Sequence, residues 1–139
     1  MTTTPFRILH HICIVVHDLE QSVAYYESLG IGPWQDFPPL TGFSRLEVPN
    51  PEAFAALRYR FTQLDNVQLQ LCQPPHLDCP QRRFLDTKGE GVFHIGFEYD
   101  VDQAAEAARS SGWTFSSGAS VRTVPASSTS TPWTGPAPC

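Results

Sequence analysis

The sequence predicts an α+β domain built from two related modules, because one strand–helix unit occurs twice. In the first copy, His11 lies in a strand rich in Ile and Val, and the helix that follows ends at Gly30. In the second copy, His94 lies in a similar strand, and its helix ends at Gly112. The histidine and the glycine are almost equally far apart in both copies. We therefore interpret the chain as an internal duplication of a supersecondary unit.

The first module is expected to cover residues 7–74. Residues 7–16 have the Ile and Val content of a buried strand. A helix is predicted over 18–29, because Asp18 is a good N-cap and Gln21 stands three residues later. The glycine that follows this helix favours a left-handed C-cap. Apolar residues at helical spacing give the helix one face that can cover a sheet.

The rest of the first module is predicted to contain a hairpin after a long loop. Residues 32–52 are rich in proline, which favours loop with one short strand near 43–48. Residues 57–63 and 67–73 alternate in polarity, and the turn residues between them predict two antiparallel strands.

The second module is expected to be truncated after its helix and one strand. A polar, proline-rich connector precedes it, and the module itself resembles the first one in element order. The predicted segments are the connector 75–90 with a short helix near 82–87, a strand over 91–99, a helix over 100–111 with Asp100 as N-cap, and a strand over 113–116. We place the partial second module at 91–116 and the whole domain at 1–116.

Composition excludes several function classes. The formal net charge is −5 and no basic patch stands out, which disfavours nucleic-acid binding. No apolar run approaches the roughly 20 residues of a membrane helix, and the N-terminus lacks the pattern of a signal peptide. The cysteines form no Cys-x-x-Cys pair, so we expect a reduced, cytoplasmic protein with structural thiols. They are Cys13, Cys72, Cys79 and Cys139.

Three side chains are candidate metal ligands. Because side chains alternate along a strand, His11, Gln70 and His94 each lie opposite the apolar face of their strand. In one cupped sheet they could converge on the concave surface, where imidazole nitrogens and an amide oxygen suit Zn, Fe or Ni. The alternative is that each histidine is a hydrogen-bonded structural residue. His10 is expected to face the helix side or the strand edge.

Several stretches of the sequence resemble the vicinal oxygen chelate superfamily of glyoxalases, bleomycin resistance proteins and dioxygenases. The first is His-His-Ile-Cys-Ile-Val-Val at 10–16, followed by Tyr-Tyr-Glu-Ser-Leu-Gly at 25–30. The second is Leu-Gln-Leu-Cys-Gln-Pro at 69–74. The third, Lys-Gly-Glu-Gly-Val-Phe-His-Ile-Gly-Phe-Glu at 88–98, looks most like the methylmalonyl-CoA epimerase branch.

The resemblance implies paired βαβββ modules that form a cupped sheet around a divalent ion. It implies His11, Gln70 and His94 as ligands and leaves the ion open among Zn, Ni, Co, Mn and Fe. It also implies a small-molecule substrate. Because the truncated second module lacks its last two strands, a sheet edge and apolar surface should be exposed, and we expect a homodimer or an aggregating monomer. In this family the ion binds substrate oxygens and stabilises an enolate.

Two positions depart from the family pattern. The fourth ligand should be a glutamate late in the second module, but residues 113–139 contain no Asp or Glu. The epimerase branch has an acidic base near the third strand, but residues 57–61 contain no carboxylate. No catalytic residue is therefore assigned, and a chain without these carboxylates is expected to be impaired or inactive as a catalyst.

Three functions are compatible with this pattern. The first is a glyoxalase-like, metal-dependent lyase or isomerase that acts on a small carbonyl or acyl-thioester compound. The second is a non-catalytic module that sequesters a small molecule. The third is a relative of the ring-cleaving dioxygenases, which need two histidines and one glutamate on Fe(II).

The C-terminal segment 117–139 is expected to be a disordered tail. It consists almost entirely of Ser, Thr, Pro, Ala and Gly, which cannot bury enough surface to offset the entropy of ordering. A shifted reading frame is one interpretation, since reading one base earlier permits a turn followed by an alternating strand. A naturally divergent tail is the alternative.

Overall fold

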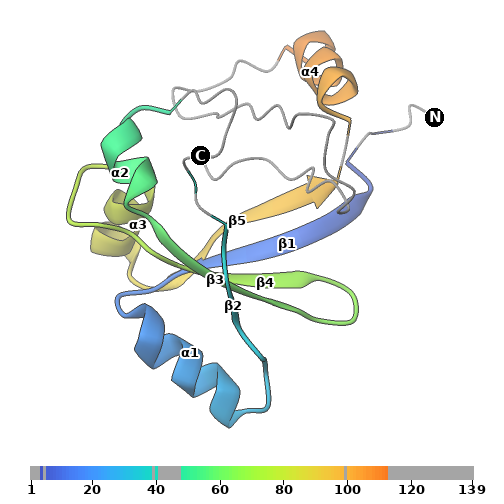
Figure 1. Ribbon diagram of the computed structural model, residues 1–139. Helices are drawn as coiled ribbons and strands as arrows, with labels where there is room; N and C mark the ends of the chain where they lie inside the picture. The colour runs from blue at the N-terminus through green and yellow to red at the C-terminus, as the bar shows by residue number, and fades with distance from the viewer. Residues whose placement is uncertain (1–3, 5, 39, 41–47, 99, 113–139) are drawn as a thin grey trace.

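The computed structural model describes residues 4, 6–38, 40, 48–98 and 100–112 (Figure 1). In chain order the elements are β1 (Ile8–Val15), α1 (Leu19–Ser28), β2 (Gln35–Asp36), α2 (Pro51–Ala55), β3 (Arg58–Gln63), β4 (Gln68–Gln73), α3 (Pro80–Lys88), β5 (Gly91–Glu98) and α4 (Val101–Ser110). Within these residues, no helix is both long enough and apolar enough to cross a membrane.

The described strands form one sheet in the order β2-β3-β4-β1-β5. Strand β1 runs parallel to β4, and the other neighbours are antiparallel. The two duplicated strands, β1 and β5, are therefore neighbours in the sheet, and β5 is at the edge of its described part. This architecture confirms the predicted α+β class, and the β3–β4 pairing confirms the predicted hairpin.

The helices that follow the two duplicated strands begin and end in the same way. The side chains of Asp18 and Asp100 each accept a hydrogen bond from the backbone N–H three residues later, at 2.9 and 3.0 Å. Gly30 and Gly112 follow the helices with φ angles of 81° and 71°, a left-handed conformation that glycine adopts without steric cost. Matching caps confirm the predicted duplication at the level of local structure.

The connecting segments differ from the sequence-based expectation. Asn50 caps a short helix, α2, and accepts from the N–H of Ala53 at 3.1 Å, although the prolines of 32–52 had indicated a loop. Pro51 stands in the first turn, where its missing N–H costs nothing. Helix α3 is longer than the predicted 82–87, and the two-residue strand β2 was not predicted.

Four predicted features lie outside the described residues. They are most of the short strand near 43–48, the strand over 113–116, the domain boundary at 116 and the tail 117–139.

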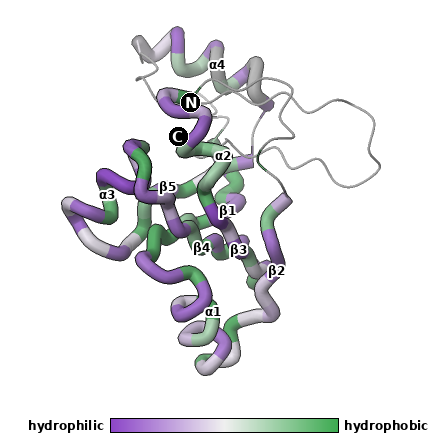
Figure 2. The backbone as a smooth tube through the Cα atoms, turned by 60° about the vertical axis from the view of Figure 1, so that its left-hand side comes forward, coloured by the Kyte–Doolittle hydropathy of each residue, from purple (hydrophilic) through white to green (hydrophobic). Residues whose placement is uncertain are grey.

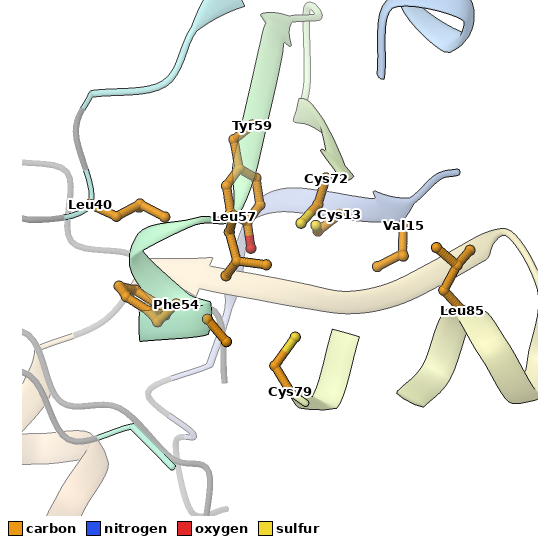
Figure 3. Packing of buried hydrophobic residues seen from close by; sticks show 10 residues of the cluster. Cys13, Val15, Leu40, Phe54, Leu57, Tyr59, Cys72, Cys79 and Leu85 are labelled. Atoms are coloured by element: carbon orange, nitrogen blue, oxygen red, sulfur yellow. The ribbon is translucent and has the colours of Figure 1, made fainter. Parts of the chain in front are cut away.

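Helices cover both faces of the sheet. On one face, Leu19 and Val23 of α1 pack with Trp34 against Leu71. On the other face, residues of β1, β3 and β4 pack with residues of α2 and α3 (Figure 3). These residues form a second core, whose buried members are Cys13, Val15, Leu40, Ala53, Phe54, Leu57, Tyr59, Cys72, Cys79 and Leu85. Hydrophobic positions occur along the central strands, α1 mixes hydrophobic and hydrophilic positions, and α3 is largely hydrophilic (Figure 2).

The second core corrects one expectation. The sequence predicted that helices can cover the apolar face opposite His11 and that His11 could lie on a concave surface. In the structure, Cys13 and Val15 share the face of His11 and are fully buried beneath α2 and α3. The candidate ligands therefore lie beside a packed core rather than on an open concave surface.

Candidate functional site

The structure brings His11 and His94 together. Their Nε2 atoms are 3.0 Å apart, and the ring planes are almost perpendicular, at 86°. His11 lies on β1, where it is 1% exposed, and His94 lies on the antiparallel neighbour β5. In the register His94 faces Cys13, so the two imidazoles meet along a diagonal between the strands. Two residues that are distant in sequence thus form a direct side-chain pair.

Gly96 provides the space for the His11 ring. Gly96 stands opposite His11 in the β1–β5 register. A Cβ atom at this position would collide with Cε1, Nδ1 and Nε2 of the imidazole. Glycine in a strand often marks such a close approach. The absence of a side chain at Gly96 therefore leaves room for the imidazole against the neighbouring strand.

Register shifts on both strands turn additional aromatic side chains toward the pair. One shift leaves His10 as an extra residue on β1, and the other leaves Phe93 as an extra residue on β5. Such bulges break the two-residue alternation and redirect side chains. Nδ1 of His10 consequently lies 2.9 Å from Nδ1 of His11. The expectation that His10 faces the helix side or the strand edge was wrong for this reason.

The third predicted ligand, Gln70, is buried on the neighbouring strand β4. It stands opposite Cys13, while Gln68 stands opposite His11. The Gln70 amide nitrogen donates to the Gln68 side-chain oxygen at 2.7 Å. This bond fixes the orientation of the Gln70 amide and leaves its carbonyl oxygen as the atom that could bind an ion.

Both paired histidines are neutral at neutral pH. Burial, together with repulsion from His94 and His10, lowers the pKa of His11 to about 3. Burial lowers the pKa of His94 to about 4. A neutral imidazole keeps a lone pair, which is the form that binds a metal ion or accepts a proton. Nδ1 of His94 is buried and has no hydrogen-bond partner among the described residues.

The pair fits two ligand positions of a divalent ion. Two nitrogens that bind an ion at about 2.1 Å are about 3.4 Å apart in a tetrahedral site, and at the right angle of an octahedral site they are about 3.0 Å apart. The observed separation of His11 and His94 has this value. Within the part of the chain that the structure describes, no three His, Cys, Asp or Glu residues are grouped to hold an ion. The described residues therefore offer two candidate ligand positions, with Gln70 as a further candidate.

A surface hollow of about 490 Å³ lies elsewhere. Its lining includes Tyr25 and Tyr26 of α1, Ile14 of β1, and Glu90 and Val92 near β5. Ile14 packs with the α1 core, on the face away from His11. The hollow is therefore on the opposite face of the sheet and is not part of the histidine site.

Comparison with known proteins identifies a superfamily and several similar structures. Residues 10–129 match the sequence profile of the Glyoxalase/Bleomycin resistance protein/Dioxygenase superfamily. A search of curated proteins gave no match. Among solved structures, methylmalonyl-CoA epimerase from Mycobacterium tuberculosis is similar with a TM-score of 0.59 and 23% identity, covering 81% of this chain and 69% of that chain.

Two further solved structures are similar at somewhat higher identity. A methylmalonyl-CoA epimerase in complex with methylmalonyl-CoA and NH4+ is 29% identical, with a TM-score of 0.57 and coverage of 77% and 71%. A Streptomyces coelicolor methylmalonyl-CoA epimerase variant in complex with 2-nitronate-propionyl-CoA is 30% identical, with a TM-score of 0.57 and coverage of 78% and 72%. The sequence-based resemblance is thereby confirmed. The chain belongs to the glyoxalase/bleomycin resistance/dioxygenase superfamily, the vicinal oxygen chelate proteins.

Proposed function

We propose that the chain is a metal-dependent lyase or isomerase of the glyoxalase type that acts on a small acyl thioester or carbonyl compound. The observation that carries this proposal is the pair of neutral imidazoles with Nε2 atoms 3.0 Å apart. His11 and His94 would hold a divalent ion, and Gln70 would contribute its amide oxygen. The acyl-CoA ligands of two similar epimerase structures support the acyl-thioester class.

The chemistry follows from the surroundings of the pair. A bound divalent ion would polarise a substrate carbonyl and so acidify the neighbouring C–H bond. Burial of His11 strengthens electrostatic interactions there, because the local dielectric is low. Strand β3 carries Arg58, Tyr59 and Arg60 but no carboxylate. We therefore assign no proton-transfer residue in the described part of the chain.

Metal binding is the first test. The full chain is stripped with a chelator, reloaded with Co²⁺, Ni²⁺ or Zn²⁺, and its metal content and affinity are measured. We expect His11→Ala and His94→Ala to weaken binding by at least about tenfold, because each removes a ligand. His76→Ala, on an exposed loop residue, is the matched control and should bind normally. A wild-type chain that retains no divalent ion would contradict the metal-dependent function.

Substrate turnover is the second test. Methylmalonyl-CoA in D₂O reports proton exchange at the carbon next to the thioester by NMR. Exchange that depends on added metal and is lost in His94→Ala would support an isomerase.

A non-catalytic binding function has its own support. Within the described residues, no three His, Cys, Asp or Glu side chains are arranged to hold a metal ion, and β3 has no carboxylate to move a proton. Saturable binding of an acyl-CoA without deuterium exchange would favour this sequestering function. The dioxygenase alternative requires a carboxylate beside two histidines, and the described residues contain no such group.

A further inference from the structure

Three histidines form a continuous chain of ring contacts. Nδ1 of His11 lies 2.9 Å from Nδ1 of His10, and Nε2 of His11 lies 3.0 Å from Nε2 of His94. A neutral imidazole carries one N–H and one lone pair. In each contact one ring must therefore donate and the other accept. The proton positions on the three rings are coupled, because His11 takes part in both contacts.

Two arrangements of the ring protons allow both hydrogen bonds. The burial of the His94 ring favours one of them. If His11 carries its proton on Nε2, it donates to His94, whose own proton is then on Nδ1. That Nδ1 is buried without a hydrogen-bond partner among the described residues, so a buried N–H would be unpaired. If His11 carries its proton on Nδ1, it donates to His10, and His94 leaves only a lone pair unpaired. Unpaired buried donors are the rarer and more costly case.

The position of His10 agrees with the second arrangement. His10 reaches His11 because it is the extra residue in the β1 register. In this arrangement the proton of His10 is on Nε2.

We propose that His10 is a positioning residue that accepts the Nδ1–H of His11 and holds the Nε2 lone pair of His11 toward the site. Neutral histidine in water prefers the opposite tautomer, with its proton on Nε2. Without His10, the Nδ1–H of His11 would lose its acceptor, and His11 would favour a proton on Nε2, the nitrogen that would bind an ion. The inference deepens the proposed function and rests on it only for the consequence on metal affinity, not for the proton positions.

The proton positions can be measured in the metal-free, full-length chain. Long-range ¹⁵N–¹H NMR of histidine-labelled protein distinguishes protonated from unprotonated ring nitrogens. We expect His11 of the wild type to be protonated on Nδ1. A wild-type His11 protonated on Nε2 would overturn the proposal, and this spectrum decides the point whether or not any variant folds.

Two variants separate positioning from packing. His10→Asn places an amide oxygen at the position of the imidazole Nδ1, whereas His10→Gln places it one methylene farther away. We expect His11 to keep its Nδ1 proton in the Asn variant and to move it to Nε2 in the Gln variant. His76→Gln is the exposed control and should leave the spectrum of His11 unchanged. A Gln variant with an unchanged His11 tautomer would overturn the proposal.

A Co²⁺ titration of the same proteins measures the consequence. Groups that orient a metal-binding histidine typically change affinity by about 10- to 100-fold. We expect a loss of this size in His10→Gln and rescue by His10→Asn. Equal Co²⁺ affinity in the wild type and the Gln variant would contradict the role of His10. A wild-type chain that binds no Co²⁺ would instead contradict the proposed function, while the NMR result would still decide the role of His10.

Discussion

The two copies of the duplicated unit have the same local structure but different tertiary surroundings. Strand β1 has neighbours on both sides, and α1 packs on the sheet through Leu19 and Val23. Strand β5 is at the edge of the described sheet, and Val92 and Ile95 are 54% and 51% exposed. Helix α4 lies at the opposite end of the molecule from α1 and has at most slight contact with other described elements (Figure 1). Similar local sequence therefore specifies a helix and a strand without specifying what packs against them.

The substitution Gly96→Ala should change the stability of the protein most, because it acts where the strands of the two copies meet. The added methyl group would displace the His11 ring, which has no free space beneath a packed core. We expect a loss of about 3 kcal/mol in the free energy of unfolding, as for overpacked core sites. Chemical denaturation measures this loss. Gly91→Ala on the same strand meets nothing within 4 Å and should be nearly neutral. A stable Gly96→Ala protein would show that the His11 position is not fixed by β5.

Acidification should have the second-largest effect, because it destabilises the protein through the buried histidine pair. The folded-state pKa values of His11 and His94, about 3 and about 4, lie below the unfolded value of 6.5. The stability that they contribute is therefore fully present above pH 6.5 and is lost as the pH falls from 6.5 to about 4 for His94 and to about 3 for His11. By linkage we expect a loss of about 2 kcal/mol or more at pH 5 relative to pH 7.5. Urea midpoints at both pH values test this, and His94→Gln should reduce the difference. Equal midpoints would contradict the neutral, buried pair.

The exposed edge of the second copy should support self-association. We expect a homodimer in which apolar residues of β5, including Ile95, become buried. Ile95→Lys should weaken dimerisation by at least about tenfold, or about 1.4 kcal/mol, because it places a charge in an apolar contact. Light scattering over a concentration series measures the association. Leu29→Lys, on an exposed residue at the end of α1, is the control. A wild-type chain that stays monomeric throughout the series would contradict the expectation.

Removal of the two helix caps should have the smallest effect on stability. It compares the two copies most directly, because the same hydrogen bond is lost in α1 and in α4. Asp18→Ala should cost about 1 kcal/mol, because α1 is part of the folded core. Asp100→Ala breaks an equivalent bond, but α4 contacts little of the described structure, so global stability should change much less. Hydrogen exchange should show faster opening of α4 alone in this variant. Equal losses of global stability would indicate that α4 folds together with the sheet.

Local chemistry made much of the fold predictable. The N-cap aspartates, the terminal glycines and the apolar spacing predicted α1 and α4 to within a residue or two. Period-two alternation correctly separated the α1-facing side of β1 and β4 from the side of His11 and Gln70. Helix α2 was missed because proline signals both a loop and the first turn of a helix.

The sequence by itself determined the duplicated strand–helix units, because caps and side-chain alternation act over a few neighbouring residues. Only the tertiary structure decided how closely the predicted side chains approach and that His10 joins them. His10 joins His11 because a register shift between β1 and β5 adds a residue, and such a shift depends on how two distant strands pair. His11 and His94 reach 3.0 Å because Gly96 leaves room on the facing strand. Pairing between segments far apart in the chain sets these contacts, and a local pattern carries no information about it.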